Sequence, residues 1–144
     1  MHLKPFLTIE YAKLIGEGCL TKASEQNWNV CVAVCDDGGH LLWLNRSHEV
    51  PPVSSIIATN KARTAAMGRR ESKVYEDQIN NGRYAFLSAP DVTALMEGGV
   101  PIMINSFCIG AVGVSNLKPA EDSLVAKAGI DMFANQINNE KLWN

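Results

Sequence analysis

The chain has 144 residues, about the length of one domain, so we expect residues 1–144 to fold as a single unit with its own core. Thirteen basic and fifteen acidic side chains leave a net charge of −2, which provides no basic excess for phosphates and argues against a nucleic-acid partner. Hydrophobic residues make up 47% and charged residues only 19%, a balance that argues against disorder and favours a surface partly covered by self-association.

The first predicted element is a helix that begins at Thr8, whose hydroxyl can cap the first turn, and ends before Asn27. Apolar and small residues recur at steps of three and four along one face of it: Leu7, Tyr11, Leu14, Ile15, Gly18, Cys19 and Ala23. We therefore expect this helix to pack one side against the core.

Residues 30–35 read Val-Cys-Val-Ala-Val-Cys, with apolar or small side chains on both faces of a strand. Strands of that composition are usually covered on both sides. Residues 36–39, Asp-Asp-Gly-Gly, supply a turn, and residues 40–45 return as a second strand. The pattern predicts a β-hairpin.

Two prolines at 51–52 end the hairpin, and Ser54 or Ser55 is positioned to cap an alanine-rich helix. We expect this second helix to end at Gly68 in the left-handed C′ conformation. A third, shorter helix is predicted over residues 72–80.

Residues 83–90 are predicted as a loop, and three short strands follow it at 93–97, 100–104 and 107–115. The Gly-Gly pair at 98–99 is predicted as a hairpin turn between the first two. In the last strand, Gly110 and Gly113 are unusual, because glycine in a strand interior marks a close approach of something else. Either a helix lies over these glycines or a ligand approaches their backbone.

A final helix begins near Pro119, with Glu121 and Asp122 placed favourably for the helix dipole. Its apolar face is formed by Leu124, Val125, Ala128, Met132, Phe133 and Ile137. Residues 135–144 read as a polar tail with an exposed Trp143.

The predicted order α-β-β-α-α-β-β-β-α indicates an α+β fold, with a five-stranded antiparallel sheet and helices on its faces. No strand leads through a G-x-G-x-x-G turn into a helix, so a dinucleotide-binding parallel sheet fits poorly.

Four cysteines are too sparse for a disulfide framework and read as small buried hydrophobes: Cys19, Cys31, Cys35 and Cys108. The first twenty residues do not form a secretory signal, and no window approaches the ~20 apolar residues of a membrane span. We therefore expect a cytoplasmic protein with no membrane partner. No nucleophile motif and no zinc spacing is present, so no catalytic residue is predicted.

The candidate ligand-binding residues lie on loops and on one helix. His48 occupies a loop beside Glu49 and is either solvated or a ligand contact, whereas His40 opens a strand and has either a structural or a binding role. Lys61 and Arg63 interrupt a helix of small residues. They are either solvated or salt-bridged, or they form an anion-facing edge that holds a carboxylate.

Five segments occur together in order: residues 34–41 (Val-Cys-Asp-Asp-Gly-Gly-His-Leu), 61–65 (Lys-Ala-Arg-Thr-Ala), 98–102 (Gly-Gly-Val-Pro-Ile), 109–115 (Ile-Gly-Ala-Val-Gly-Val-Ser) and 121–122 (Glu-Asp). From about Val30 to about Met132 they resemble the GlcG/HbpS family, which includes the C-terminal domain of PduO-type adenosyltransferases. The resemblance implies a profilin-like α/β/α domain that forms homo-oligomers, often tetramers to octamers. It also implies haem or related tetrapyrroles as ligands, and a setting near genes for diol, glycerol or glycolate use.

A tetrapyrrole site needs an apolar slot, a donor to the metal and cations for the ligand's carboxylates. Trp43, Phe86 and the glycine-rich last strand are candidates for the slot, and His48 or His40 for the donor. The candidate cations are Arg46, Lys61 and Arg63.

Three functions follow as hypotheses. The first is a haem- or corrinoid-binding carrier, sensor or accessory factor, with haem or cobalamin as the ligand. The second is an enzyme that acts on a small oxygenated metabolite or on a bound tetrapyrrole. The third is a non-catalytic structural subunit of a metabolic complex. No acid/base pair favours the enzyme, so the binding protein is preferred.

Overall fold

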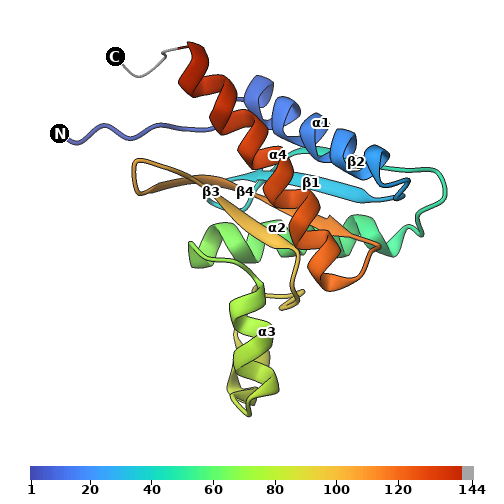
Figure 1. Cartoon of the computed structure of the whole chain (residues 1–144). Coiled ribbons are helices and arrows are strands. Elements are labelled where there is room, and N and C mark those ends of the chain that lie inside the picture. Colours follow the sequence, from blue (N-terminus) through green and yellow to red (C-terminus); the bar gives the residue numbers. More distant parts are fainter. Residues whose placement is uncertain (141–144) are drawn as a thin grey trace.

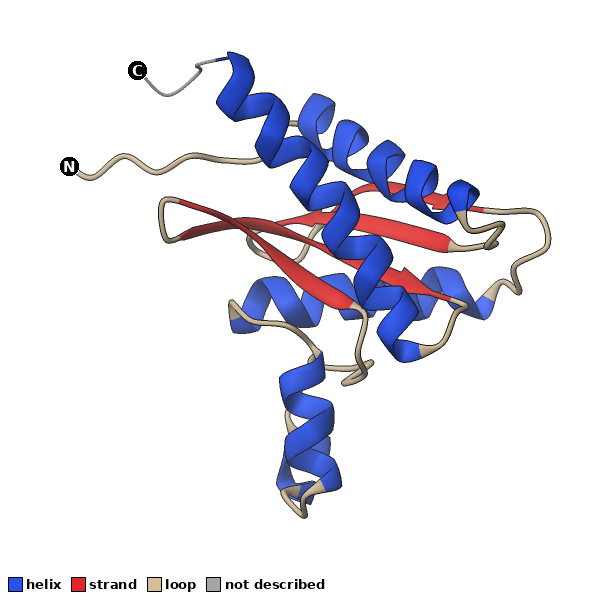
Figure 2. Ribbon diagram, viewed as in Figure 1, coloured by secondary structure: helices blue, strands red, loops and turns tan. Residues whose placement is uncertain are grey.

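The computed structural model describes residues 1–140, which form α-helices and one antiparallel sheet with a single short 3₁₀ turn (Figures 1 and 2). The helices are α1 (Ile9–Glu25), α2 (Val53–Gly68), α3 (Lys73–Asn80) and α4 (Pro119–Glu140), and the 3₁₀ turn is η1 (Tyr84–Ser88). The strands are β1 (Cys31–Asp36), β2 (Leu41–Arg46), β3 (Gly99–Ile104) and β4 (Phe107–Ser115). Trp143, which was predicted to be exposed in a polar tail, lies outside the described residues.

The sheet has the strand order β2-β1-β4-β3 and separates two layers of helices. Helices α1 and α4 pack side by side on one face, and α2 packs on the other (Figure 1). The α+β class and the antiparallel sheet with helices on both faces are therefore confirmed. Within residues 1–140, no helix is both long and apolar enough to cross a membrane.

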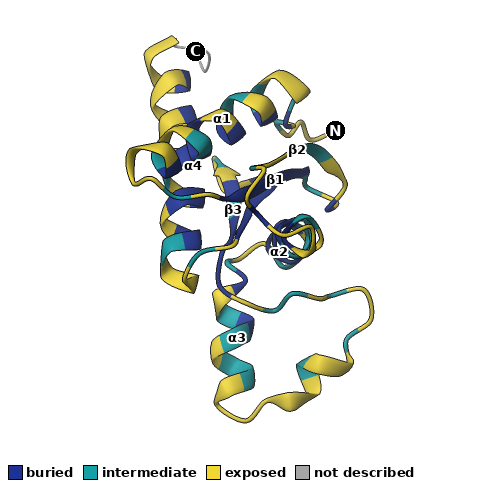
Figure 3. Cartoon of the chain, turned by 90° about the vertical axis from the view of Figure 1, so that its right-hand side faces the viewer, coloured by how far each residue is buried: buried dark blue, intermediate teal, exposed yellow. Residues whose placement is uncertain are grey.

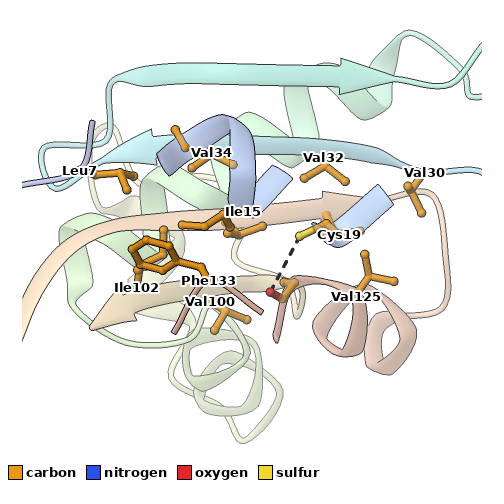
Figure 4. Close-up of a cluster of buried hydrophobic side chains, with 14 of the residues drawn as sticks. Leu7, Ile15, Cys19, Val30, Val32, Val34, Val100, Ile102, Val125 and Phe133 are labelled. Atoms are coloured by element: carbon orange, nitrogen blue, oxygen red, sulfur yellow. Dashed lines mark hydrogen bonds between the residues drawn. The ribbon is translucent and has the colours of Figure 1, made fainter. Parts of the chain in front are cut away.

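The main core lies between the sheet and the pair α1 and α4 (Figure 4). Val32 and Val34 from β1 meet Ile15 of α1 and Phe133 of α4 there. The other face of the sheet has a thinner core, built from cysteine and alanine side chains under α2. The four cysteines are buried and unpaired, as predicted, and burial raises the pKa of Cys19 to about 12.

Several local predictions are confirmed. The backbone N–H of Tyr11 donates to the hydroxyl of Thr8 at 3.1 Å, so Thr8 caps α1. The final helix begins at Pro119 as expected. Gly113 lies beneath α2, where an added Cβ would overlap the carbonyl oxygen of Ala58. Gly110 is also buried, but against β1 and the side chain of Leu7 and not under a helix.

The prediction of five strands was wrong, because residues 93–97 form no strand and residues 98–99 form no hairpin turn. Ala94 has φ 50°, outside the range of a strand. Helix side chains bind the backbone of this segment instead: Thr64 Oγ1 donates to the carbonyl of Thr93 at 2.6 Å, and the N–H of Glu97 donates to Glu76 at 2.8 Å. These bonds replace the partner strand that the segment would otherwise need.

Both predicted ends of α2 were wrong. The helix begins at Val53 without a side-chain cap, so Ser54 and Ser55 lie inside its first turn. Gly68 is the last helical residue, and Arg69 takes the left-handed conformation with φ 55°. Glycine is needed at 68 for space, because a Cβ there would overlap the hydroxyl of Tyr75. The loop predicted at 83–90 contains η1.

Helix α3 and η1 form an arm that projects from the body of the molecule (Figures 1 and 3). The ring of Tyr75 meets that of Phe86 edge-on, with centroids 5.2 Å apart, and Arg83 covers Phe86. Most of the arm is exposed or only partly buried (Figure 3), including the apolar side chains of Tyr84 and Leu87.

Candidate functional site

The turn between β1 and β2 is organised by Asp36. Its carboxylate accepts hydrogen bonds from the backbone N–H groups of Gly38 and His40, each at 2.9 Å. Both carboxylate oxygens also lie 3.2 Å from Nδ1 of His40. The His40 side chain is 77% exposed. When Nδ1 carries the proton it donates to Asp36, and the lone pair on Nε2 is available to a ligand.

The contact between His40 and Asp36 is of the kind that prepares a histidine to bind a metal. Histidines that bind metals usually donate their other ring N–H to a carboxylate or carbonyl, which fixes the tautomer and makes the imidazole a better ligand. His40 and Asp36 have that arrangement. Among residues 1–140, no group of three or more His, Cys, Asp or Glu side chains is placed to hold a bare metal ion. The arrangement therefore suits a metal ion that is already coordinated by a cofactor and needs only one further ligand from the protein.

Three cationic side chains surround the same turn: Lys4, Arg63 and Arg69. Arg63 of α2 packs on Gly39, where an added Cβ would lie 2.8 Å from its Cγ. Arg69 donates to the carbonyl of Asp37. The Arg63 guanidinium, in contrast, makes no hydrogen bond or ion pair within residues 1–140 and remains available. Asp37 is paired with Lys4 at 2.6 Å, and this hydrogen bond holds the pKa of Asp37 below its usual value.

An apolar surface follows the turn along β2. Leu41 and Leu44 pair with Cys35 and Ala33, whose side chains lie under α2. Paired residues of an antiparallel sheet point to the same face, so both leucines lie on the α2 side. They are 49% and 37% exposed, because α2 packs mainly on the other strands and covers this edge strand only slightly.

Arg46 ends this surface at the far end of β2. It pairs with Cys31 and therefore lies on the same face, and its Nη1 donates to the carbonyl of Val50. We call the surface formed by Leu41, Leu44 and Arg46 the β2 strip. The structure thus places three predicted site residues along this strand, with His40 and Arg63 at the turn where the strip begins and Arg46 at its far end.

His48 lies away from His40. It borders an open cavity of about 610 Å³ between the end of α1 and the end of β2, together with Trp28 and Asn29. The six residues of β2 separate the two histidines by ~20 Å at the usual rise per residue. One protomer therefore cannot present both imidazoles to one metal.

Lys61 is buried and engaged within the fold. Its Nζ lies 2.9 Å from the carboxylate of Asp122 and 2.9 Å from the carbonyl oxygen of Val114. Burial outweighs the attraction of Lys61 and raises the pKa of Asp122 to about 6. Of the two interpretations of Lys61, the geometry matches the salt-bridged one, and its ammonium does not face the β2 strip.

The aromatic residues considered for the slot do not meet. Trp43 lies on the opposite face of β2, against Gly16 of α1, and Phe86 lies in the arm. The apolar wall is formed instead by Leu41 and Leu44, which the sequence reasoning did not single out. It also missed Asp36 as the partner of His40, although a carboxylate at the start of a tight Gly-Gly turn is well placed to reach the residue that ends it.

Known proteins of similar sequence agree with this assignment of the fold. A family model described as "Haem degrading protein HbpS-like" matches residues 7–131. The chain is 50% identical over 115 residues to Protein GlcG of Escherichia coli strain K12, covering 80% of this chain and 85% of that protein. It is 31% identical over 131 residues to an uncharacterized 15.0 kDa protein from the dhaT-dhaS intergenic region of Citrobacter freundii, covering 89% and 92% of the two chains.

Solved structures share the fold. Protein ORFY of Klebsiella pneumoniae superposes with a TM-score of 0.86 at 28% identity, over 93% of this chain and 94% of that one. A PduOC–haem complex superposes with a TM-score of 0.78 at 21% identity, over 88% and 94%. With a family match over most of its length and half of its aligned residues shared with GlcG, the chain belongs to the GlcG/HbpS family.

Proposed function

We propose that this protein binds haem on the β2 strip, with His40 as its ligand to the iron. The observation that carries the proposal is the contact between His40 Nδ1 and the Asp36 carboxylate at 3.2 Å, which leaves Nε2 exposed. Family membership supports haem as the ligand, since the family is described as haem-degrading and one protein of the same fold was crystallised as a haem complex. The family description and the solved haem complex both favour haem over a corrinoid as the ligand.

The rest of the surface fits the chemistry of the group. The macrocycle is apolar and would lie against Leu41 and Leu44, while its two carboxylates need cations. Arg63 at one end and Arg46 at the other provide them. Bound haem would supply a redox-active iron; the residues of this chain hold it, orient it and neutralise its carboxylates.

The β2 strip is one wall of a site and not a closed pocket. Binding sites usually bury ~70–90% of a small ligand, and Leu41 is 49% exposed. We therefore propose that a second copy of the chain supplies the opposite wall, in a cytoplasmic homo-oligomer of four to eight subunits. The low charged fraction of 19% supports self-association.

A carrier or sensor is favoured over an enzyme. The Asp36 carboxylate is committed to two backbone N–H groups and to His40, which leaves it poorly placed to move protons. The pathway served, whether diol, glycerol or glycolate use, is a separate part of the proposal and is supported only by the family resemblance.

The test is a titration of the purified protein with haemin, followed through the Soret band. We expect saturable binding near one haem per protomer. His40→Ala should weaken it at least tenfold and shift the band. His48→Ala is the matched control, since it also removes an exposed histidine. It should leave the affinity for haemin and the position of the Soret band unchanged. Asp36→Asn should weaken binding less than His40→Ala while altering the spectrum, because Asp36 only positions the imidazole.

Four results would redirect the proposal. Equal losses for His40→Ala and His48→Ala would place the haem elsewhere. Saturable binding of cobalamin without haemin would favour the corrinoid. Loss of the Soret band on adding a reductant and oxygen, with release of iron, would favour an enzyme that degrades haem. Binding of neither ligand by a stable oligomer would favour the structural subunit.

A further inference from the structure

The sheet has two free edges, and the chain protects only one of them. In the strand order β2-β1-β4-β3, the outer strands β2 and β3 each have one side without a neighbouring strand among the described residues. A free edge exposes backbone N–H and C=O groups that can pair with another strand, and proteins usually block it. An edge without such a block is therefore a candidate for pairing.

The edge of β3 is blocked by the chain itself. Because the N–H of Val114 donates to the carbonyl of Gly98, alternate residues from Gly99 onward direct their backbone groups away from β4. Ser72 binds both groups of Gly99: its Oγ accepts from the N–H at 2.8 Å, and its own N–H donates to the carbonyl at 3.0 Å. The next outward residue is Pro101, which has no N–H. Little of this edge remains for another strand to bind.

The edge of β2 has no such protection. The N–H of Ser47 donates to the carbonyl of Val30 at 3.1 Å, so Ser47 faces β1. By the alternation of an antiparallel ladder, Leu44 and Arg46 direct their N–H and C=O groups outward. Both residues are exposed, and no hydrogen bond within residues 1–140 reaches these outward groups. The strand also contains no proline.

The spacing of the free groups defines the strand that fits them. An outward residue of an antiparallel pair exchanges two hydrogen bonds with the residue opposite it. A second β2 strand, related by a twofold axis through Asn45, places Leu44 opposite the partner's Arg46 and Arg46 opposite the partner's Leu44. This register satisfies the outward N–H and C=O of both residues on both copies. Twofold pairing of identical surfaces is also the commonest form of self-association.

We propose that two copies of the chain join their β2 strands edge to edge, antiparallel, about a twofold axis at Asn45. The two sheets then become one continuous sheet. On the α2 side, Leu44 packs against the aliphatic stem of the partner's Arg46, while each guanidinium is held by the carbonyl of Val50 in its own protomer. The pairing covers an apolar edge that would otherwise favour aggregation, in agreement with a charged fraction of only 19%.

The pairing also gives the haem site its walls, a consequence that rests on the proposed function. Helix α2 packs mainly on β4 and β1, so the joined sheet carries two adjacent β2 strips between two α2 helices. Arg63 of α2 packs on the β1–β2 turn, and the exposed Ile56 lies two helical turns earlier on the same flank. In the pair these flanks face each other across the strips, and the second copy supplies the opposite wall.

Engineered cysteines test the register in the absence of haem. Opposite residues that are not hydrogen-bonded have Cα atoms ~4.5 Å apart, within the ~4.4–6.8 Å that a disulfide spans. Asn45→Cys should therefore cross-link two copies when diamide is added. Leu44→Cys is the matched control, because the two Leu44 positions lie diagonally, ~7–8 Å apart. Met103→Cys, exposed on β3, is the control for the other edge, and the four native cysteines are buried.

We expect Asn45→Cys to cross-link at least about tenfold faster than either control. Faster cross-linking of Leu44→Cys or Met103→Cys would overturn the proposal, as would no cross-linking of Asn45→Cys. If Asn45→Cys cross-links but haemin does not bind, the pairing stands and the proposed haem site fails. If haemin binds and Asn45→Cys does not cross-link, the pairing fails and the haem site stands.

Light scattering at micromolar concentration provides a second test. The wild type should be a dimer or an even multiple of one, and a monomer would overturn the proposal. Leu44→Pro removes an outward N–H, as Pro101 does on β3, and should halve the size of the assembly without changing the circular dichroism. Leu44→Ala keeps the N–H and should dissociate the pair less. The cross-linking result does not depend on whether Leu44→Pro folds.

Discussion

Gly113 should be the position on β4 least tolerant of a methyl group. A Cβ added there would overlap the carbonyl oxygen of Ala58 and lie 2.6 Å from the backbone nitrogen of Ala62. Both atoms belong to the backbone of α2, so no side-chain rotation relieves the contact. The change Gly113→Ala therefore has to move the helix itself.

The size of the effect follows from the contacts that α2 would lose. Non-bonded heavy atoms prefer separations of about 3.5–4.0 Å, so α2 must move away from the sheet by about 1.5 Å. A gap of about 1 Å already forfeits up to about half of the dispersion attraction across it. Overpacking usually costs ~1–3 kcal/mol, and displacement of a whole helix places this variant at the upper end. About 3 kcal/mol corresponds to a fall in melting temperature of about 10 °C.

Urea denaturation and thermal melting of purified variants measure this loss. The matched control is Gly38→Ala, where the added methyl meets the exposed ring of His40 at 3.0 Å and Asp36 Oδ1 at 3.5 Å, and should cost much less. Combining Gly113→Ala with Ala58→Gly should not restore stability, because the overlap is with a carbonyl. Restoration by that second change, or a loss for Gly113→Ala below about 1 kcal/mol, would refute the close approach of α2.

Two further predictions concern buried titratable groups. The folded pKa of Asp122 is raised from 3.8 to about 6, so protonation favours the folded state: its contribution to stability is present below about pH 4 and is lost as the pH rises through 6. When the pH is lowered from 7 to 4, the urea concentration at the unfolding midpoint should therefore increase less for Asp122→Asn than for the wild type. Burial also raises the pKa of Cys19 and Cys35 to about 12, so at pH 8 the folded chain should react with a thiol reagent far more slowly than the urea-unfolded chain. Rapid labelling of either cysteine in the folded chain would contradict this burial.

The elements that local sequence signals define were predictable. Thr8 carries a capping hydroxyl at the start of an apolar helical face, and Pro119 has the fixed φ of a first helical residue. The hairpin follows from apolar runs on both sides of Asp36-Asp37-Gly38-Gly39. In each case the interacting groups lie within a few residues of one another.

The failures have a different physical origin. Residues 93–97 look like a strand, but their backbone is bound by Thr64 and Glu76, which are distant in sequence. Gly68 looks like a helix end, but the demand for glycine there comes from Tyr75. For Lys61 the sequence left a salt bridge and a ligand contact both open, and only the fold shows that Asp122 lies beside it. Contacts between distant segments decide all three, and the local pattern does not contain them.

The exposure of the β2 strip is a consequence of the layer arrangement. A helix with its side chains is roughly 10–12 Å wide, and neighbouring strands are roughly 4.8 Å apart, so one helix covers about two strands. Helices α1 and α4 together cover all four strands on their face. On the other face α2 is alone: it lies over β4 and β1, reaches the start of β3 at Gly99, and leaves β2 the least covered.

On the α2 side, β2 and the far end of β3 are therefore left open. Leu41 and Leu44 are exposed on β2, and Met103, which pairs with Cys108 on the same face, is exposed on β3. Alanines at the α2 interface and Gly113 in the sheet hold the helix close to the centre, so it cannot shift to cover either edge without the loss expected for Gly113→Ala. The histidine that faces solvent at the head of β2 thus stands beside apolar surface that the fold cannot cover by itself, and this is the physical reason to look for a bound ligand and a second copy at that edge.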